Sequence, residues 1–187
     1  LAIFDKEPLF AAFNPHHSSV GDMLMEYVTF MGEGSFITIV LLLLLGFSRL
    51  RNWWYFTTAV IAGVLPSLIT QVIKSATKTP RALKYFNEAP WIHTLPEWPR
   101  VMERSFPSGH SCGAFSLFCL LALLLPPKVR PLGLVFFVCA LAVAYSRMYL
   151  AAHFFEDIYV GSIIGGCFSM FTIAVMKRYQ PAFFKKR

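Results

Sequence analysis

Two long apolar runs of the chain meet at Ser146-Arg147-Met148-Tyr149-Leu150-Ala151-Ala152-His153-Phe154-Phe155-Glu156-Asp157. His153 and Asp157 are four residues apart, so on a helix they share one face. A carboxylate in that position can hold one imidazole nitrogen and leave the other free to act as a nucleophile or base. A single His/Asp pair is more often a charged helix end at a membrane surface, and two further clusters change that balance.

The composition indicates a membrane protein. Of the 187 residues, 56% are hydrophobic and 14% charged, and the mean hydropathy is +0.56, which is too apolar for an ordinary soluble domain. We therefore expect one integral-membrane domain over residues 1–187. The net charge of +7 is spread over loops without forming a stripe, so the expected partner is the lipid bilayer and not nucleic acid. The sequence makes no prediction about the oligomeric state.

The apolar runs predict an all-α, polytopic transmembrane helix bundle with about five spans. Each run is long enough to cross a hydrocarbon core of ~30 Å. The expected spans are residues 27–47, 53–73, 108–125, 132–149 and 158–176.

The segments outside the spans have their own expected places. Residues 1–26 should form an interfacial N-terminal segment with a short helix, because their apolar stretch is too short to cross. Residues 74–107 form a polar, proline-containing connection, and residues 177–187 form a basic tail. Glu33 interrupts the first span between two glycines, so we expect it near the end of that span, bordering the site.

Five spans give the two sides of the membrane different charges. One side has nine basic and no acidic residues, and by the positive-inside rule it is cytoplasmic. The residues on this side are Arg49, Arg51, Lys128, Arg130, Lys177, Arg178, Lys185, Lys186 and Arg187. The connection and the stretch from Ser146 to Asp157 then face outward. This pattern favours a bacterial inner membrane with an active site at the periplasmic face.

Three polar clusters fall at the outward ends of three spans. They are Lys74 to Arg81, Pro107-Ser108-Gly109-His110, and the stretch from Ser146 to Asp157. Together they offer three cations, two histidines and a helix N-terminus whose free N–H groups favour an anion. Such donors can surround phosphoryl oxygens and stabilise the charge that develops in the transition state. The candidate phosphate-binding residues are Lys74, Arg81, Ser108, Gly109 and Arg147.

No metal cage is expected, because the only nearby carboxylates are Glu156 and Asp157. Glu156 is a possible substitute for Asp157 in orienting the histidine. Three other histidines, at positions 16, 17 and 93, have no partner at a useful spacing and are interpreted as interfacial or loop residues.

At these residues the chain resembles the type 2 phosphatidic acid phosphatases, whose pattern is Lys-x6-Arg-Pro, Pro-Ser-Gly-His and Ser-Arg-x5-His-x3-Asp. The second and third motifs match in full. The first matches at Lys74 and Arg81 but has Ala82 in place of proline, which changes a turn residue and no charged one. The resemblance covers residues 74–157 by motif.

The resemblance implies a role for each residue. His153 would attack phosphorus and form a phosphohistidine, Asp157 would orient its ring, and His110 would protonate the leaving oxygen and then help to activate water. Lys74, Arg81, Ser108, Gly109 and Arg147 would bind the phosphoryl oxygens. No metal or other cofactor would be required.

The sequence therefore predicts a membrane lipid phosphatase. Four lipid substrates fit a cationic pocket beside hydrocarbon: undecaprenyl diphosphate, lipid A, phosphatidic acid and phosphatidylglycerol phosphate. The first two are favoured because both can present phosphate at the outer face. Two alternatives share the same residues, an enzyme similar to the vanadium-dependent haloperoxidases and a lipid or anion transporter or binding paralogue. The spans argue against the former, and polar clusters at the span ends argue against the latter.

Overall fold

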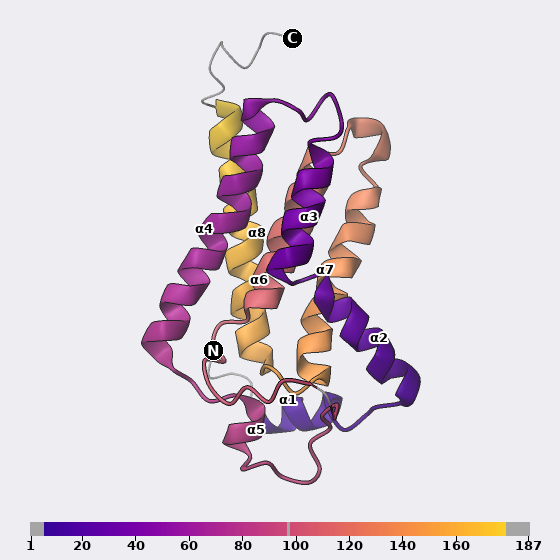
Figure 1. Ribbon diagram of the computed structural model, residues 1–187, viewed down its shortest axis with the longest axis vertical. Coiled ribbons are helices and arrows are strands. Elements are labelled where there is room, and N and C mark those ends of the chain that lie inside the picture. The colour runs from indigo at the N-terminus through magenta and orange to yellow at the C-terminus, as the bar shows by residue number, and fades with distance from the viewer. Residues whose placement is uncertain (1–5, 97, 179–187) are drawn as a thin grey trace.

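The computed structural model describes residues 6–96 and 98–178, which form an all-helical bundle (Figure 1). An isolated bridge pairs Pro80 with Glu103. The helices are α1 (Lys6–Phe13), α2 (Ser19–Phe30), α3 (Gly34–Leu44), α4 (Trp53–Thr77), α5 (Ala82–Tyr85), α6 (Gly109–Leu124), the 3-10 helix η1 (Pro127–Val129), α7 (Leu132–Tyr149) and α8 (Phe155–Arg178).

Helix α6 is the centre of the bundle and packs against α3, α4, α7 and α8. Its backbone lies directly against that of α8, because a Cβ atom on Gly161 or Gly165 would overlap the carbonyl oxygens of Ser108 and Cys112. Small residues allow this close approach between apolar helices. The contact fixes the start of α6 beside the start of α8, where two of the three polar clusters lie.

Three helices, α4, α7 and α8, are long and apolar enough to cross a membrane. They correspond to the spans expected at 53–73, 132–149 and 158–176. Helix α6 is shorter, at 16 residues, and occupies the span expected at 108–125.

The first expected span, residues 27–47, is not one straight helix. It is the end of α2 followed by α3, and these two helices are bent by 56° at a short break. The break lies at Gly32, where a Cβ atom would come within 2.6 Å of Val143 and 2.7 Å of the backbone oxygen of His110. Helix α2 also begins at Ser19, inside the segment 1–26 that was expected to be interfacial as a whole.

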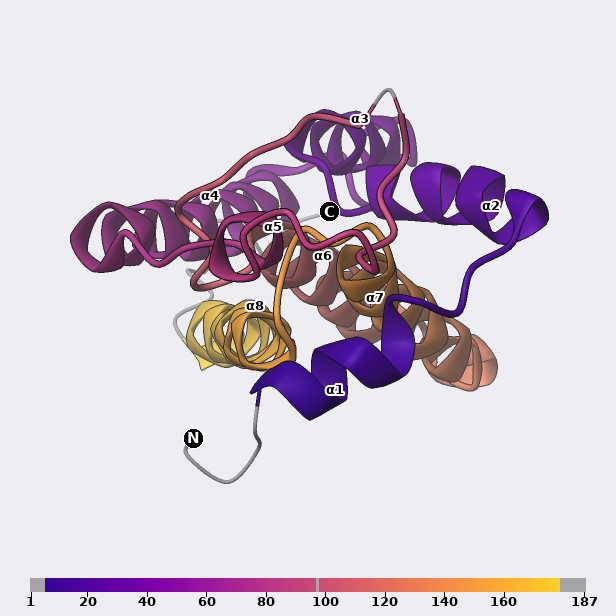
Figure 2. The same ribbon diagram turned by 90° about the horizontal axis from the view of Figure 1, so that it is seen from below.

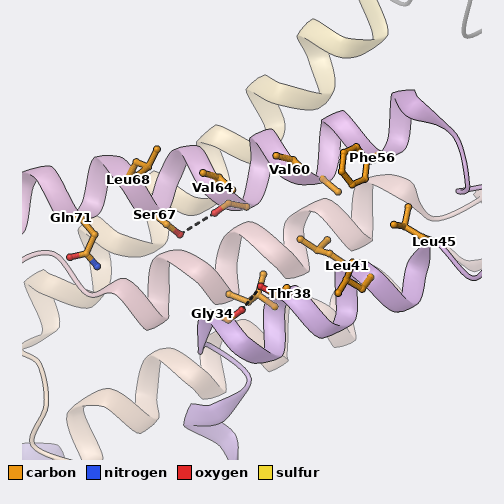
Figure 3. A pocket seen from close by; sticks show the side chains of 14 residues that line it. Gly34, Thr38, Leu41, Leu45, Phe56, Val60, Val64, Ser67, Leu68 and Gln71 are labelled. Atoms are coloured by element: carbon orange, nitrogen blue, oxygen red, sulfur yellow. Dashed lines mark hydrogen bonds between the residues drawn. The ribbon is translucent and has the colours of Figure 1, made fainter.

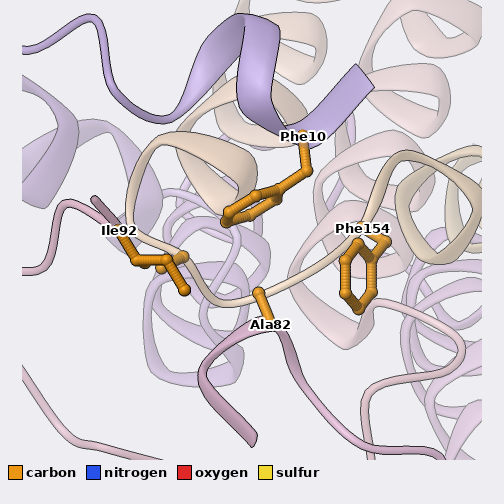
Figure 4. Close-up of a cluster of buried hydrophobic side chains, with 5 residues drawn as sticks. Phe10, Ala82, Ile92 and Phe154 are labelled. Carbon is orange, nitrogen blue, oxygen red and sulfur yellow. The ribbon is translucent and has the colours of Figure 1, made fainter. Parts of the chain in front are cut away.

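Helix α1 and the connection before α6 cover the lower end of the bundle (Figures 1 and 2). Phe10 of α1 is 1% exposed and packs in a buried cluster with Ala82, Ile92, Ala151 and Phe154 (Figure 4). This cluster joins α1 and the connection to the loop between α7 and α8. His153 belongs to that loop, so α1 and the connection pack against the segment that carries the predicted nucleophile.

The turns that carry the basic residues lie at the other end of the bundle. The α3–α4 connection, the α6–α7 turn and the end of α8 all lie at the top of Figure 1, away from α1 and α5. Arg49, Arg51, Lys128, Arg130 and the pair at 177–178 therefore share one end. The remaining three basic residues of the predicted tail lie outside the described residues.

Candidate active site

The three polar clusters of the sequence come together around one cavity of about 390 Å³. Six of the eight candidate site residues line it, drawn from α4, the connection, α6, α7 and the α7–α8 loop. They are Lys74, Arg81, Gly109, His110, Arg147 and His153. Ser108 and Asp157 lie behind this lining, and each supports it through hydrogen bonds.

His153 is held from one side of its ring. The side chain is 1% exposed, its Nδ1 lies 3.3 Å from Asp157 Oδ2, and its backbone N–H donates to the carbonyl of Arg147 at 3.1 Å. Burial, reinforced by the positive charges of Arg147, Arg81 and Lys74, lowers the pKa of His153 well below its ordinary value. The ring is therefore neutral at pH 7, as a nucleophile requires.

Asp157 connects the second and third clusters directly, and it reaches the first through Ser105, whose backbone N–H bonds to Thr79. Its Oδ2 accepts hydrogen bonds from the backbone N–H of Phe154, at 3.0 Å, and from the hydroxyl of Ser105. Its backbone oxygen accepts from the N–H of Ser108 at 2.8 Å. A buried carboxylate with several donors has a fixed position, so it can hold the ring of His153 in one orientation.

Ser105 is a site residue that the sequence did not reveal. It is fully buried, it donates to Asp157, its Oγ lies 3.4 Å from His153 Nδ1, and its backbone N–H donates to Thr79 at 3.0 Å. The only signal in the sequence is a hydroxyl residue shortly before Pro107. That signal carries no spacing information, because the carboxylate partner lies 52 residues away.

Ser108 has a different position from the other candidate phosphate ligands. Its Oγ accepts from the N–H and the hydroxyl of Ser111, at 3.3 and 2.9 Å, so it caps the N-terminus of α6. The following glycine, Gly109, lies at the cavity, where a Cβ atom would come 3.9 Å from Lys74 Nζ. The end of α6 therefore presents backbone, and not the side chain of Ser108, to a ligand.

The three cations of the cavity are not held in salt bridges within the described residues, although Glu33 lines the same cavity. Among the salt bridges of residues 6–96 and 98–178, none involves Lys74, Arg81 or Arg147. Arg147 donates from Nη1 to Thr29 Oγ1 at 2.7 Å and lies 5.7 Å from the ring of Trp98, while its buried Nε has no hydrogen-bond partner in this part of the chain. Unpaired buried charges are costly, so this arrangement fits a multiply charged anion.

Glu33 lies at the cavity, whereas Glu156 is paired with another residue. Glu33 precedes α3 and lines the same cavity as Arg147, which confirms that it borders the site. Glu156 forms an ion pair with Lys6 of α1 and does not take the place of Asp157.

Comparison with known proteins agrees with these motifs. A family model described as the PAP2 superfamily matches residues 64–181, which is more than half of the chain. The chain belongs to the PAP2 superfamily.

Two kinds of relative within this superfamily are similar to the chain. A lipid A 1-phosphatase from Rhizobium etli is 31% identical over 125 residues, covering 67% of this chain and 50% of the relative. The undecaprenyl-diphosphatase BcrC of Bacillus subtilis is 28% identical over 153 residues, covering 80% of this chain and 71% of the relative. The chain thus spans about half the length of the lipid A phosphatases that it matches.

Two crystal structures share the fold of this chain. LpxE from Aquifex aeolicus has a TM-score of 0.75 and 21% sequence identity, and covers 92% of this chain and 97% of its own. A transmembrane PAP2-type phosphatidylglycerolphosphate phosphatase from Bacillus subtilis has a TM-score of 0.74 and 21% identity, and covers 93% and 85%. These similarities show that the bundle has the fold of transmembrane PAP2 proteins.

One polar cluster of this PAP2 domain lies outside the cavity, and it shows that His93 is not an isolated loop residue. His93 Nε2 lies 2.7 Å from Asp22 Oδ1, and the hydroxyl of Tyr149 donates to the same oxygen at 2.7 Å. The ring also stacks on His17, with centroids 3.8 Å apart. His17 and His93 both lie in loops, as expected, and the partner of His93 could not be found from spacing because Asp22 is 71 residues away in sequence.

The donor set of this PAP2 site suits an anion better than a cation. Within the described part of the chain, no three His, Cys, Asp or Glu side chains are grouped so that they could hold a metal ion. The cavity instead combines three cationic side chains with the backbone at the start of α6.

Proposed function

We propose that this protein is a metal-independent membrane phosphatase that hydrolyses a phosphate monoester or diphosphate of a lipid through a phosphohistidine intermediate. The observation that carries the proposal is a buried, neutral histidine facing a cavity lined by three cations, none of which forms a salt bridge within the described residues. The superfamily and the lipid phosphatases among its relatives support the same activity.

In the first step, Nε2 of His153 attacks phosphorus while Nδ1 remains toward Asp157. The N–P bond forms, the bond from phosphorus to the leaving oxygen breaks, and His110 transfers a proton to that oxygen. The ring of His153 becomes positively charged in the phosphohistidine. The Asp157 carboxylate stabilises this charge and is itself fixed by Ser105.

In the second step, a water molecule attacks the phosphohistidine. His110 accepts the proton from the water, the N–P bond breaks, and phosphate leaves with His153 regenerated. Throughout both steps, Lys74, Arg81 and Arg147 balance the charge on the equatorial oxygens. Positioned charges and backbone donors of this kind supply most of the catalysis of phosphoryl transfer.

The site is proposed to face the extracytoplasmic side, and the membrane to be a bacterial inner membrane. The bundle end opposite to the cavity carries the basic turns, which by the positive-inside rule favours a cytoplasmic location for that end. Lipids that present phosphate at the outer face, such as undecaprenyl diphosphate and lipid A, are then the favoured substrates. Relatives of this chain are named for activity on these two lipids.

The test is phosphate release by the purified protein in detergent from undecaprenyl diphosphate, lipid A, phosphatidic acid and phosphatidylglycerol phosphate, compared side by side. We expect release from at least one lipid, and none from the same lipid with the His153→Ala variant. A parent protein that binds these lipids but releases no phosphate from any of them would be a binding or transport paralogue. Peroxide-dependent halide oxidation with added vanadate, in place of hydrolysis, would indicate the haloperoxidase-like alternative.

A further inference from the structure

The cavity contains one carboxylate that the proposed reaction does not use. Among the described residues that line the cavity, Glu33 is the only acidic one. It lies at the break between α2 and α3, where a Cβ atom on the preceding Gly32 would come within 2.7 Å of the backbone oxygen of His110. At the following Gly34, a Cβ atom would meet open space. The break therefore packs on the start of α6 and holds Glu33 at the rim of the cavity.

The carboxylate of Glu33 caps no helix and forms no salt bridge within residues 6–96 and 98–178. Its charge interacts with that of Arg147, which lines the same cavity. The bent pair of helices α2 and α3 is long and apolar enough to cross the membrane. An ionisable residue inside such a segment is costly and commonly marks a substrate site. The position of Glu33 therefore points to a role in binding the substrate.

Gln71 adds a second hydrogen-bond acceptor to this side of the cavity. It also lines the cavity, and Figure 3 shows it on α4 at the same end of the space between α3 and α4 as Gly34, the neighbour of Glu33. Glu33 and Gln71 are exposed, whereas Arg147 and His153 are 4% and 1% exposed. The cavity thus has a buried part with cations and the nucleophile, and a rim whose side-chain oxygens accept hydrogen bonds.

The charges that line the cavity suit a phosphate monoester better than a diphosphate. Lys74, Arg81 and Arg147 contribute three positive charges and Glu33 one negative charge, which leaves an excess of two positive charges. A phosphate monoester carries a charge of about −1.5 to −2 at pH 7. In a diphosphate, the reacting phosphate lies against His153 and the second phosphate extends toward the rim. Repulsion by Glu33 therefore acts more strongly on a diphosphate than on a monoester.

We propose that Glu33 determines the specificity for the headgroup: it disfavours diphosphates and, together with Gln71, accepts hydrogen bonds from hydroxyl or amide N–H groups beside a phosphate monoester. This inference rests on the proposed function and concerns the same site. A lipid phosphate on a sugar or a glycerol can supply such donors, whereas a prenyl diphosphate has none between its phosphates and its chain. Of the two lipids favoured above, lipid A is then the better substrate.

The first test compares phosphatidic acid with diacylglycerol diphosphate, which have the same acyl chains and differ by one phosphate. The measured quantity is the ratio of kcat/KM for phosphatidic acid to that for the diphosphate, from initial phosphate release in mixed micelles. We expect this ratio to fall about tenfold in Glu33→Gln, which removes the charge and keeps the size of the side chain. Tenfold corresponds to about 1.4 kcal/mol, the interaction of two unit charges about 12 Å apart at an effective dielectric constant of about 20.

The second test isolates the hydrogen bonds. It compares 1-acyl-glycerol 3-phosphate with its 2-deoxy analogue, which has the same chain and charge but lacks the hydroxyl group. We expect the parent to prefer the compound with the hydroxyl group about fivefold, as for one hydrogen bond of about 1 kcal/mol. Gln71→Leu should reduce this preference and leave the ratio between monoester and diphosphate unchanged, because Gln71 is neutral. Glu33→Ala should lower both ratios.

The matched control is Glu88→Gln. Glu88 is an acidic residue of the connection that lies 3.6 Å from Arg100 and does not line the cavity. Removing its charge should leave both ratios at the parent values. An unchanged ratio between monoester and diphosphate in Glu33→Gln, or an equal fall in Glu88→Gln, would overturn the role of Glu33 while leaving the phosphatase activity intact.

A binding measurement without turnover completes the test. Calorimetry of the protein in detergent compares inorganic phosphate with methylenediphosphonate, a diphosphate analogue that cannot be hydrolysed. Relative to phosphate, Glu33→Gln should bind the diphosphonate about tenfold more tightly than the parent does, and equal relative affinities would refute the effect of the charge. A parent that releases no phosphate from any lipid would instead refute the proposed function, and the binding measurement would still decide whether Glu33 discriminates between the two anions.

Discussion

Removal of the Ser105 hydroxyl tests whether that residue acts through Asp157. In the folded protein Ser105 Oγ donates to Asp157 Oδ2, which leaves the backbone N–H of Phe154 and the ring of His153 as the other neighbours of that oxygen. A hydrogen bond to a charged group contributes about 1.5–3 kcal/mol. If the whole of this amount acts on the orientation of His153, Ser105→Ala should lower kcat by about 10- to 150-fold.

The assay is steady-state phosphate release from a water-soluble aryl phosphate. We expect the loss in kcat with little change in KM, since Ser105 does not line the cavity that binds phosphate. Ser105→Thr keeps a hydroxyl and should recover part of the rate. Ser169→Ala is the control, because Ser169 is also fully buried and bonded to another serine, Ser116, but lies away from the cavity.

The decisive comparison uses the Asp157→Asn background. If Ser105 acts through the carboxylate, Ser105→Ala should have almost no further effect once the charge is gone, because residues in one hydrogen-bond network are not additive. An equal fall in kcat in both backgrounds would show an independent role for Ser105 and refute the reasoning. A similar fall for Ser169→Ala would show that the loss reflects general destabilisation.

Four further predictions concern the nucleophile, the metal, the topology and the pH dependence. His153→Ala should abolish the trapping of labelled phosphate on the protein after a quench without acid, and equal labelling of this variant and the parent would contradict the assignment. Asp157→Asn should keep a small residual turnover. Activity should survive EDTA and be inhibited by vanadate, which imitates the five-coordinate transition state, so loss with EDTA and recovery with magnesium would refute metal independence. In a cysteine-free background, Glu88→Cys should react with an impermeant thiol reagent from outside, whereas Lys128→Cys should react only after permeabilisation. The reverse pattern would place the cavity on the cytoplasmic side. Burial depresses the pKa of His153, so below about pH 6.5 the unfolded chain binds a proton that the folded protein does not. The free energy of unfolding should therefore be unaffected by this group above about pH 6.5 and should fall by up to about 1.4 kcal/mol per pH unit below that value. Thermal unfolding of the parent and of His153→Gln as a function of pH measures the difference.

The sequence alone was sufficient for the fold class and for the grouping of most candidate site residues around one cavity. The length of an apolar run decides whether a helix can cross a membrane, and this is a local property of the chain. The positions of four helices could therefore be predicted, including α7 at its observed bounds. Because helix ends meet at the two membrane surfaces, clusters at the same ends of three spans were also expected to converge, as they do around the candidate cavity.

Tertiary packing decided the features that depend on contacts between distant residues. The bend before α3 follows from the approach of Gly32 to Val143 and His110, which no apolar pattern reports. The partners of Ser105 and His93 are 52 and 71 residues away, so no spacing in the sequence connects them. These hydrogen bonds form only because the packed helices bring buried donors and acceptors together, where each must be satisfied.

A hollow of about 380 Å³ between α3 and α4 has the same origin (Figure 3). Each helix is apolar on its own, and the sequence of either one indicates only a membrane segment. A hollow arises where a glycine of one helix faces the other, as Gly63 faces Leu41, and this depends on the rotation and separation of the two helices. Hydrophobicity thus determined where the chain enters the membrane, whereas the shape of the packed side chains decided where a hollow remains between the helices.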